Sequence, residues 1–75
     1  MSIREERVSE AAYYQCKKNP KSPAWEDITD SRWALLYCRF INDKKEVRRH
    51  IKKSDDAKVY CQKVKDDPKV RKFII

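Results

Sequence analysis

The apolar positions along the chain recur with the period of α-helices. Within residues 3–18, Val8, Ala12 and Cys16 recur every four positions, which predicts a helix with one narrow buried face. Residues 30–42 carry a wider apolar stripe at the helical spacing i, i+3, i+4, i+7 and i+8, formed by Trp33, Leu36, Tyr37, Phe40 and Ile41. Because this segment is the most apolar of the chain, we expect it to form the central helix of the core.

Start signals divide the rest of the chain. Ser22-Pro23 and Asp67-Pro68 each combine an N-cap residue with proline, the residue favoured at the first helical position. Asp43 is placed to cap a basic helix, and Ser54 to cap the next one. The predicted helices cover residues of about 3–18, 23–29 (short), 30–42, 43–53, 54–66 and 68–75. The residue order shows no internal repeat that we recognise.

The composition favours an all-helical fold. The chain of 75 residues contains no glycine, and tight β-hairpin turns rely on Asn-Gly or Asp-Gly pairs. Its hydrophobic share of 40% is enough for one compact core. We therefore predict that residues 1–75 form a single all-α domain, a compact bundle of four to five short helices.

The positive charge is concentrated in the second half of the chain. Residues 1–43 contain seven Lys or Arg and seven Asp or Glu, whereas residues 44–75 contain twelve and five, so the whole net charge of +7 lies after residue 43. Such asymmetry indicates binding to an acidic partner: a nucleic acid, an anionic membrane or an acidic protein surface. We expect no membrane, because a basic helix at a membrane interface needs Trp, Phe or Leu opposite its charges and residues 44–53 offer only Val47 and Ile51.

The basic segment 43–53 suggests where that partner would bind. If it is helical, its cations form two rows at i, i+4 and i+8 beside Val47 and Ile51. Like charges at this spacing repel one another, so the pattern favours a phosphate-binding face, with a solvated face as the alternative. The candidate binding residues are Lys44, Lys45, Arg48, Arg49, Lys52, Lys53, Lys58, Arg71 and Lys72.

Two functions remain open from the sequence. The first is a small basic intracellular protein that binds nucleic acid, DNA or RNA, and acts as a regulator. The alternative is a non-enzymatic adaptor or inhibitor whose basic face binds an acidic partner protein. The apolar end of the chain, residues 73–75, would dock on the core or allow a homodimer through the C-terminal helix.

Other chemistries have little support in the sequence. The three cysteines lie far apart from one another, unlike the close pairs of structural zinc sites, so we expect no metal. Without glycine, phosphate-cradling loops and nucleophile elbows cannot form, and we expect neither a cofactor nor enzymatic activity. The polar N-terminus, the lack of a long apolar run and the odd cysteine count favour a cytoplasmic protein, or a nuclear one in a eukaryote, and not a secreted one.

Overall fold

The protein is helical along its length. A computed structural model describes residues 2–75, with side chains from Arg4 onward. Its elements are α1 (Ser2–Lys18), the 3-10 helix η1 (Pro23–Asp27), α2 (Ser31–Phe40), α3 (Lys45–Arg48), α4 (Ser54–Lys63) and α5 (Pro68–Arg71). The radius of gyration is 11.4 Å, close to the value of about 11 Å expected for a compact chain of this length. The predicted compact all-α fold is confirmed.

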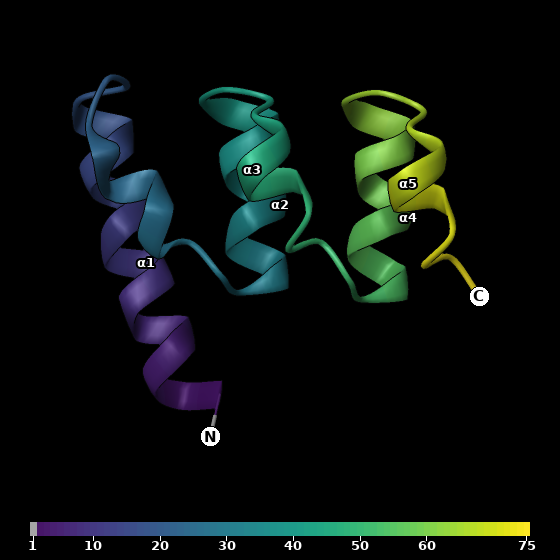
Figure 1. The fold of residues 1–75 in the computed structure, drawn as a ribbon, viewed down its shortest axis with the longest axis horizontal. Coiled ribbons are helices and arrows are strands. Elements are labelled where there is room, and N and C mark those ends of the chain that lie inside the picture. The colour runs from purple at the N-terminus through teal and green to yellow at the C-terminus, as the bar shows by residue number, and fades with distance from the viewer. Residues whose placement is uncertain (1) are drawn as a thin grey trace.

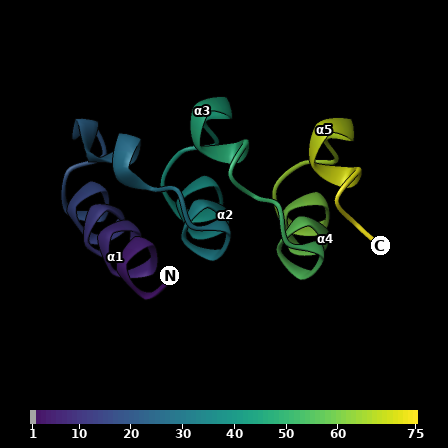
Figure 2. The ribbon, with the colours of Figure 1, turned by 60° about the horizontal axis from the view of Figure 1, so that its bottom comes forward.

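The helices form three units, each a longer helix followed by a short one. Unit 1 comprises α1 and η1, unit 2 comprises α2 and α3, and unit 3 comprises α4 and α5. Figure 1 shows the units side by side in chain order. In Figure 2 the longer helices form one layer and the short helices a second. The molecule is accordingly a slab, with principal extents of 30 × 28 × 15 Å.

The three units share a sequence signature. Each longer helix carries the pattern Ser-x-x-Ala-x-x-x-Cys, and the serines begin 22 and 23 residues apart. The signature residues are Ser9, Ala12 and Cys16 in unit 1, Ser31, Ala34 and Cys38 in unit 2, and Ser54, Ala57 and Cys61 in unit 3. The expectation of no internal repeat was therefore wrong. The repeat escapes notice because the shared residues are small, whereas the larger apolar residues around them differ.

Each signature serine holds the backbone that follows the short helix of its own unit. The Ser31 hydroxyl accepts hydrogen bonds from the amides of Lys52 and Lys53, at 3.1 and 3.2 Å. Ser9 accepts those of residues 29 and 30, at 3.1 and 3.0 Å. Ser54 accepts that of residue 75, at 3.0 Å. The same side chain thus ties the end of each unit to its own longer helix, at the first residue of α2 and α4 and in the middle of α1.

The core lies between the two layers. The signature alanines are buried, and their small side chains let the helices approach closely. The short-helix layer contributes fully or almost fully buried residues from each unit: Ile28, Val47, Ile51 and Val70. The longer helices contribute most of the remaining buried apolar residues, which are Ala12, Tyr13, Cys16, Ala34, Leu35, Tyr37, Cys38, Ala57 and Tyr60.

The chain ends its helices without glycine. The Tyr37 carbonyl accepts the amides of both Ile41 and Asn42, at 2.9 and 3.0 Å. Tyr60 does the same for the amides of residues 64 and 65, at 2.9 and 3.0 Å. None of the residues that the structure describes has positive φ. The doubled carbonyl contact therefore replaces the left-handed residue that commonly closes a helix.

The predicted helix at 43–53 is wrong in length. Only Lys45–Arg48 is helical. After Arg48 the chain turns so that Ile51 becomes fully buried, and the next two amides bond to the Ser31 hydroxyl instead of continuing the helix. The two predicted rows of cations therefore do not form on one helix.

Two of the four predicted caps are confirmed, and the helices after the first end earlier than predicted. Asp43 does not cap α3, whose N-cap is Lys44 without a side-chain cap bond. Ser54 is the first residue of α4 and not its cap, because Lys53 holds that position. Ser22 caps η1 and accepts the Ala24 amide at 3.2 Å. Asp67 caps α5 and accepts the Lys69 amide at 2.9 Å. The predicted helix at 68–75 ends at Arg71, because the following residues turn to place Phe73 and Ile74 against the core.

The predicted core was too inclusive around α2. Phe40 is 60% exposed, and the Arg39 guanidinium carbon lies 4.8 Å from its ring centroid. Trp33 is only partly buried; its ring centroid lies 5.3 Å from that of Tyr13 and 5.8 Å from that of Tyr14. The apolar stripe of this segment is wider than the face that neighbouring helices cover, so its edges reach solvent.

Candidate binding site

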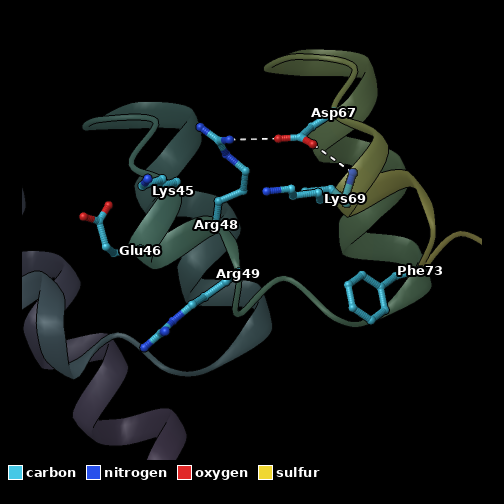
Figure 3. Close-up of a pocket in the computed structure, with 8 residues that line it drawn as sticks. Lys45, Glu46, Arg48, Arg49, Asp67, Lys69 and Phe73 are labelled. Atoms are coloured by element: carbon cyan, nitrogen blue, oxygen red, sulfur yellow. Dashed lines mark hydrogen bonds and ion pairs between the residues drawn. The ribbon is translucent and has the colours of Figure 1, made fainter.

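A hollow of about 360 Å³ opens between α3 and α5 on the short-helix layer. We call it the α3–α5 hollow; Figure 3 shows its lining. It lies at the junction of units 2 and 3, where one short helix follows the next. The lining residues are Lys45, Glu46, Arg48, Arg49, Asp67, Lys69, Val70 and Phe73.

An ion pair between the two units fixes the wall of this hollow. Arg48 Nη1 lies 2.8 Å from Asp67 Oδ2, and Arg48 Nε lies 3.1 Å from Asp43 Oδ1. The side chains of Arg48 and Asp67 are only 15% and 9% exposed. The hydrogen bond from the Lys69 amide, together with Arg48, lowers the pKa of Asp67. Because the Arg48 guanidinium is already paired with two internal carboxylates, its first role is to join unit 2 to unit 3.

Two exposed lysines stand at the mouth of the hollow. Lys45 comes from α3 and Lys69 from α5, and Figure 3 shows Lys69 extending from α5 toward Arg48. Neither lysine lies within ion-pair distance of an acid in the described part of the chain. The apolar residues of the lining are Val70, which is buried, and Phe73, which is partly buried. The site thus combines unpaired cations from two units with an apolar base.

Three of the residues predicted from sequence line this hollow, namely Lys45, Arg48 and Arg49. In Figure 3 the Arg49 and Glu46 side chains point to the η1 side of α3. Lys69 was missed, because no local pattern shows that α5 follows α3 across a hollow. The internal repeat would have placed it, since Lys69 is the unit 3 counterpart of Glu46.

The remaining predicted residues lie elsewhere. Lys44 Nζ sits 4.5 Å from the Trp25 ring centroid, and Arg71 is paired with Asp66 at 2.7 Å. Lys72 Nζ lies 5.2 Å from the Phe73 ring centroid. The other three are exposed, two in the link between α3 and α4 and one on α4: Lys52, Lys53 and Lys58. The nine predicted residues are therefore spread over several parts of the surface instead of forming one face.

Two of the three cysteines are buried and bond to the backbone of their own units. Cys16 and Cys38 donate long sulfur hydrogen bonds to the carbonyls of residues 22 and 44, at 3.8 and 3.9 Å. Burial raises the pKa of the Cys38 thiol to about 12. All three cysteines are free.

Residues 2–75 bring together no group of His, Cys, Asp and Glu side chains suited to hold a metal ion. In the same part of the chain, no helix has the length and apolar character needed to cross a membrane.

No protein-family model matches this chain, and neither a curated protein nor a solved structure matches it significantly.

Proposed function

We propose that this protein is a non-enzymatic binding module that holds an acidic segment of a partner protein in the α3–α5 hollow. An anionic side chain of the partner lies between Lys45 and Lys69, while a neighbouring apolar side chain contacts Phe73, the partly exposed apolar residue of the lining. Stacked helical units commonly present such extended binding surfaces.

One observation carries the proposal. The α3–α5 hollow has exposed cations on both sides and apolar side chains at its base. A partner that offers only charge would leave that base unused, whereas an acidic peptide with an apolar residue uses both parts. Apolar anchors in pockets commonly supply most of the binding energy, and the charges around them add specificity.

The nucleic-acid hypothesis loses its main support. It rested on two rows of cations along one helix, and those rows do not form. A phosphate track needs several cations in series along a surface, but here Arg48 and Arg71 are paired with carboxylates. The net charge of +7 still attracts any polyanion at low salt, so nucleic acid is the competitor that the experiment must include.

The test measures binding of labelled probes by fluorescence anisotropy at low and at near-physiological salt. The probes are an array of short peptides with a central Glu-Leu pair, together with single- and double-stranded DNA and RNA. Wild type is compared with Lys45→Glu/Lys69→Glu and with Lys58→Glu/Lys63→Glu, which changes the net charge equally on α4. Circular dichroism verifies that each variant folds.

If the proposal is correct, acidic peptides bind at near-physiological salt. Lys45→Glu/Lys69→Glu should weaken them by about tenfold or more, which corresponds to about 1.4 kcal/mol, whereas the α4 variant should retain most of the affinity. The proposal fails if no acidic peptide binds even at low salt, or if both variants lose affinity equally. It also fails if nucleic acid binds more tightly than every peptide at near-physiological salt.

A further inference from the structure

The longer helices carry a row of apolar side chains on the face that turns away from the short helices. The signature serines, and the cysteines of units 1 and 2, bond to backbone next to the short helices, which marks the inward face. The residue two positions after each signature alanine lies about 200° around the helix from it. In the three units this outward residue is Tyr14, Leu36 and Val59. Tyr14 is 48% exposed and the other two are partly exposed, so each unit presents one apolar side chain on the outer face of its layer.

Four cations lie at the ends of the same three helices. The last turns of α1, α2 and α4 contain Lys17, Lys18, Arg39 and Lys63. All four are exposed, and none of them belongs to an ion pair in the described part of the chain. The last five residues of each of these helices include no Asp or Glu. Because the three helices lie side by side and run the same way (Figure 1), their ends form a series of cations across the whole stack.

The acids nearest to this series in the chain have partners of their own. Asp43 follows α2 and pairs with Arg48 at 3.1 Å. Asp66 follows α4 and pairs with Arg71 at 2.7 Å. None of the four cations was predicted from the sequence as a binding residue, since each helix supplies only one or two of them and the stacking of the units brings them to one edge.

Exposed aromatic side chains lie among these cations. Phe40 remains 60% exposed although the Arg39 guanidinium lies over its ring. The ring of Tyr14 packs against that of Trp33, with 5.8 Å between the centroids, and still keeps almost half of its surface in solvent. Exposed aromatic rings beside arginine and lysine are the surface on which unpaired nucleobases stack.

A hollow of about 230 Å³ opens between α2 and α4 on this face. Its apolar lining is Leu35, Leu36 and Val59, and two arginines and two aspartates complete it. Arg32 and Asp56 form an ion pair within the protein. The other two charges, Arg39 and Asp55, belong to the last turn of α2 and the first turn of α4. They therefore lie at opposite ends of the hollow, and the cationic end adjoins the series described above.

We propose that the outer face of the longer-helix layer binds single-stranded nucleic acid, DNA or RNA, across the C-terminal ends of α1, α2 and α4. Backbone phosphates contact the four cations, and bases stack on Tyr14 and Phe40. Cations in series suit a polyanion whose charges repeat along a chain. Exposed rings suit unpaired bases, because the bases of a duplex are already stacked on one another. This face lies on the opposite layer from the α3–α5 hollow, so the inference goes beyond the proposed function and does not depend on it.

The experiment measures anisotropy of labelled oligo-dT, oligo-U and a duplex of the same length at several salt concentrations. Oligo-dT and oligo-U distinguish DNA from RNA, and binding of either one supports the inference. Wild type is compared with Lys18→Glu/Arg39→Glu, which alters the series of cations. The matched control is Lys45→Glu/Lys69→Glu, which changes the net charge equally on the short-helix layer. Phe40→Ala tests stacking, and circular dichroism verifies that each variant folds.

We expect a single strand to bind at low salt with a slope of log K against log salt of about −2.8, the value for four phosphate contacts. A threefold rise in salt then lowers affinity by about twentyfold. Lys18→Glu/Arg39→Glu should weaken binding by about tenfold or more and reduce the slope by about half, whereas the control should lose less. Phe40→Ala should weaken the single strand by about fivefold or more and leave duplex binding unchanged.

The inference is overturned if neither single strand binds at low salt, or if the duplex binds as tightly as the single strands. It is also overturned if Lys18→Glu/Arg39→Glu loses no more affinity than the control, because the strand would then occupy another face. Acidic peptides are measured with separate probes and through Lys45 and Lys69, so failure here leaves the proposed function standing.

Discussion

The hydroxyl of Ser31 donates a hydrogen bond of 2.8 Å to the carboxylate of Asp56, across the junction of α2 and α4. Asp56 is buried, and its other oxygen accepts from Arg32 Nε at 3.1 Å. A buried carboxylate is stable only when such partners replace its hydration. The Ser31 side chain thus bonds to the backbone at the end of unit 2 and also connects unit 2 to Asp56 of unit 3.

This relationship makes Ser31 the signature serine whose loss should cost most. In Ser31→Ala the Asp56 carboxylate loses a donor, and the amides of Lys52 and Lys53 lose their acceptor. Unsatisfied buried polar groups of this kind cost about 1–3 kcal/mol, and we expect the free energy of unfolding to fall by about 2–3 kcal/mol. Urea denaturation followed by circular dichroism measures the change.

Ser54→Ala is the matched control. Ser54 accepts one amide at an exposed position near the end of the chain, so its loss should cost about 1 kcal/mol or less. Equal losses for the two variants would contradict the connecting role of Ser31.

The Asp67 carboxylate, which the Lys69 amide and then Arg48 stabilise, should make stability depend on acid pH. The pKa of Asp67 is lower in the folded protein than its ordinary value, so the unfolded state takes up the proton first. The stabilisation is complete above about pH 4, the unfolded value, and is lost as the pH falls through the lower folded value. Asp67→Asn should therefore show a smaller loss of unfolding free energy between pH 5 and pH 2 than wild type, by about 1–2 kcal/mol.

Asp66→Asn controls for the change of charge. Asp66 pairs with Arg71, but both side chains are more than half exposed, and exposed pairs contribute about 0–1 kcal/mol. Urea denaturation at several pH values compares the variants. A pH profile of Asp67→Asn that matches that of wild type would show that the pair does not stabilise the junction.

Local signals in the sequence predicted part of the helix starts, because a cap depends on a few adjacent residues; Asp43 and Ser54, which were also expected to cap helices, do not. Ser22 and Asp67 cap the elements expected of them, and Asp30 caps α2. Helix ends were predicted less well because contacts distant in sequence decide them. The helix starting at Lys45 ends at Arg48 because Ile51 enters the core and the following backbone bonds to Ser31.

The residues of the candidate site were likewise predicted only in part. Charge patterning alone identified Lys45 and Arg49. It could not reveal that Arg48 pairs with Asp67, a residue 19 positions later in a different unit. Nor could it reveal that Lys69 faces α3, because that depends on how the units stack. Recognising the Ser-x-x-Ala-x-x-x-Cys repeat would have predicted that the units stack in chain order. That order brings α5 next to α3, and with it Asp67 and Lys69 near Arg48.

His50 should add a second pH effect at milder acidity. Burial, followed by the positive charges of Arg49 and Lys52, lowers its pKa below the ordinary value, and Glu5 offsets this only in part. The unfolded state therefore binds a proton first, so the free energy of unfolding falls as the pH drops below about 6.5 and levels off below the folded pKa. In His50→Gln this decline should disappear, while the loss below pH 4 remains.

Titration of His50 by NMR measures the folded pKa directly, and urea denaturation between pH 7.5 and pH 5 measures the stability change. An imidazole pKa at or above about 6.5 would contradict the environment described for His50. So would a His50→Gln variant whose stability declines over this range as steeply as that of wild type.

Cys38 should resist modification as long as the protein is folded. Its thiol is buried and donates to the carbonyl of residue 44, and its pKa of about 12 leaves only about one molecule in 10,000 as the reactive thiolate at pH 8. Cys61 is partly exposed and should be alkylated first by iodoacetamide. Mass spectrometry of proteolytic peptides after brief labelling compares the two sites in one sample, so reagent and protein concentration are identical for both.

Because protection of Cys38 comes from packing, its labelling rate should rise with urea in parallel with global unfolding and should be faster in Ser31→Ala. Rapid labelling of Cys38 in the folded protein would mean that unit 2 opens locally without unfolding, and the core between α2 and α3 would then be less cooperative than its contacts indicate.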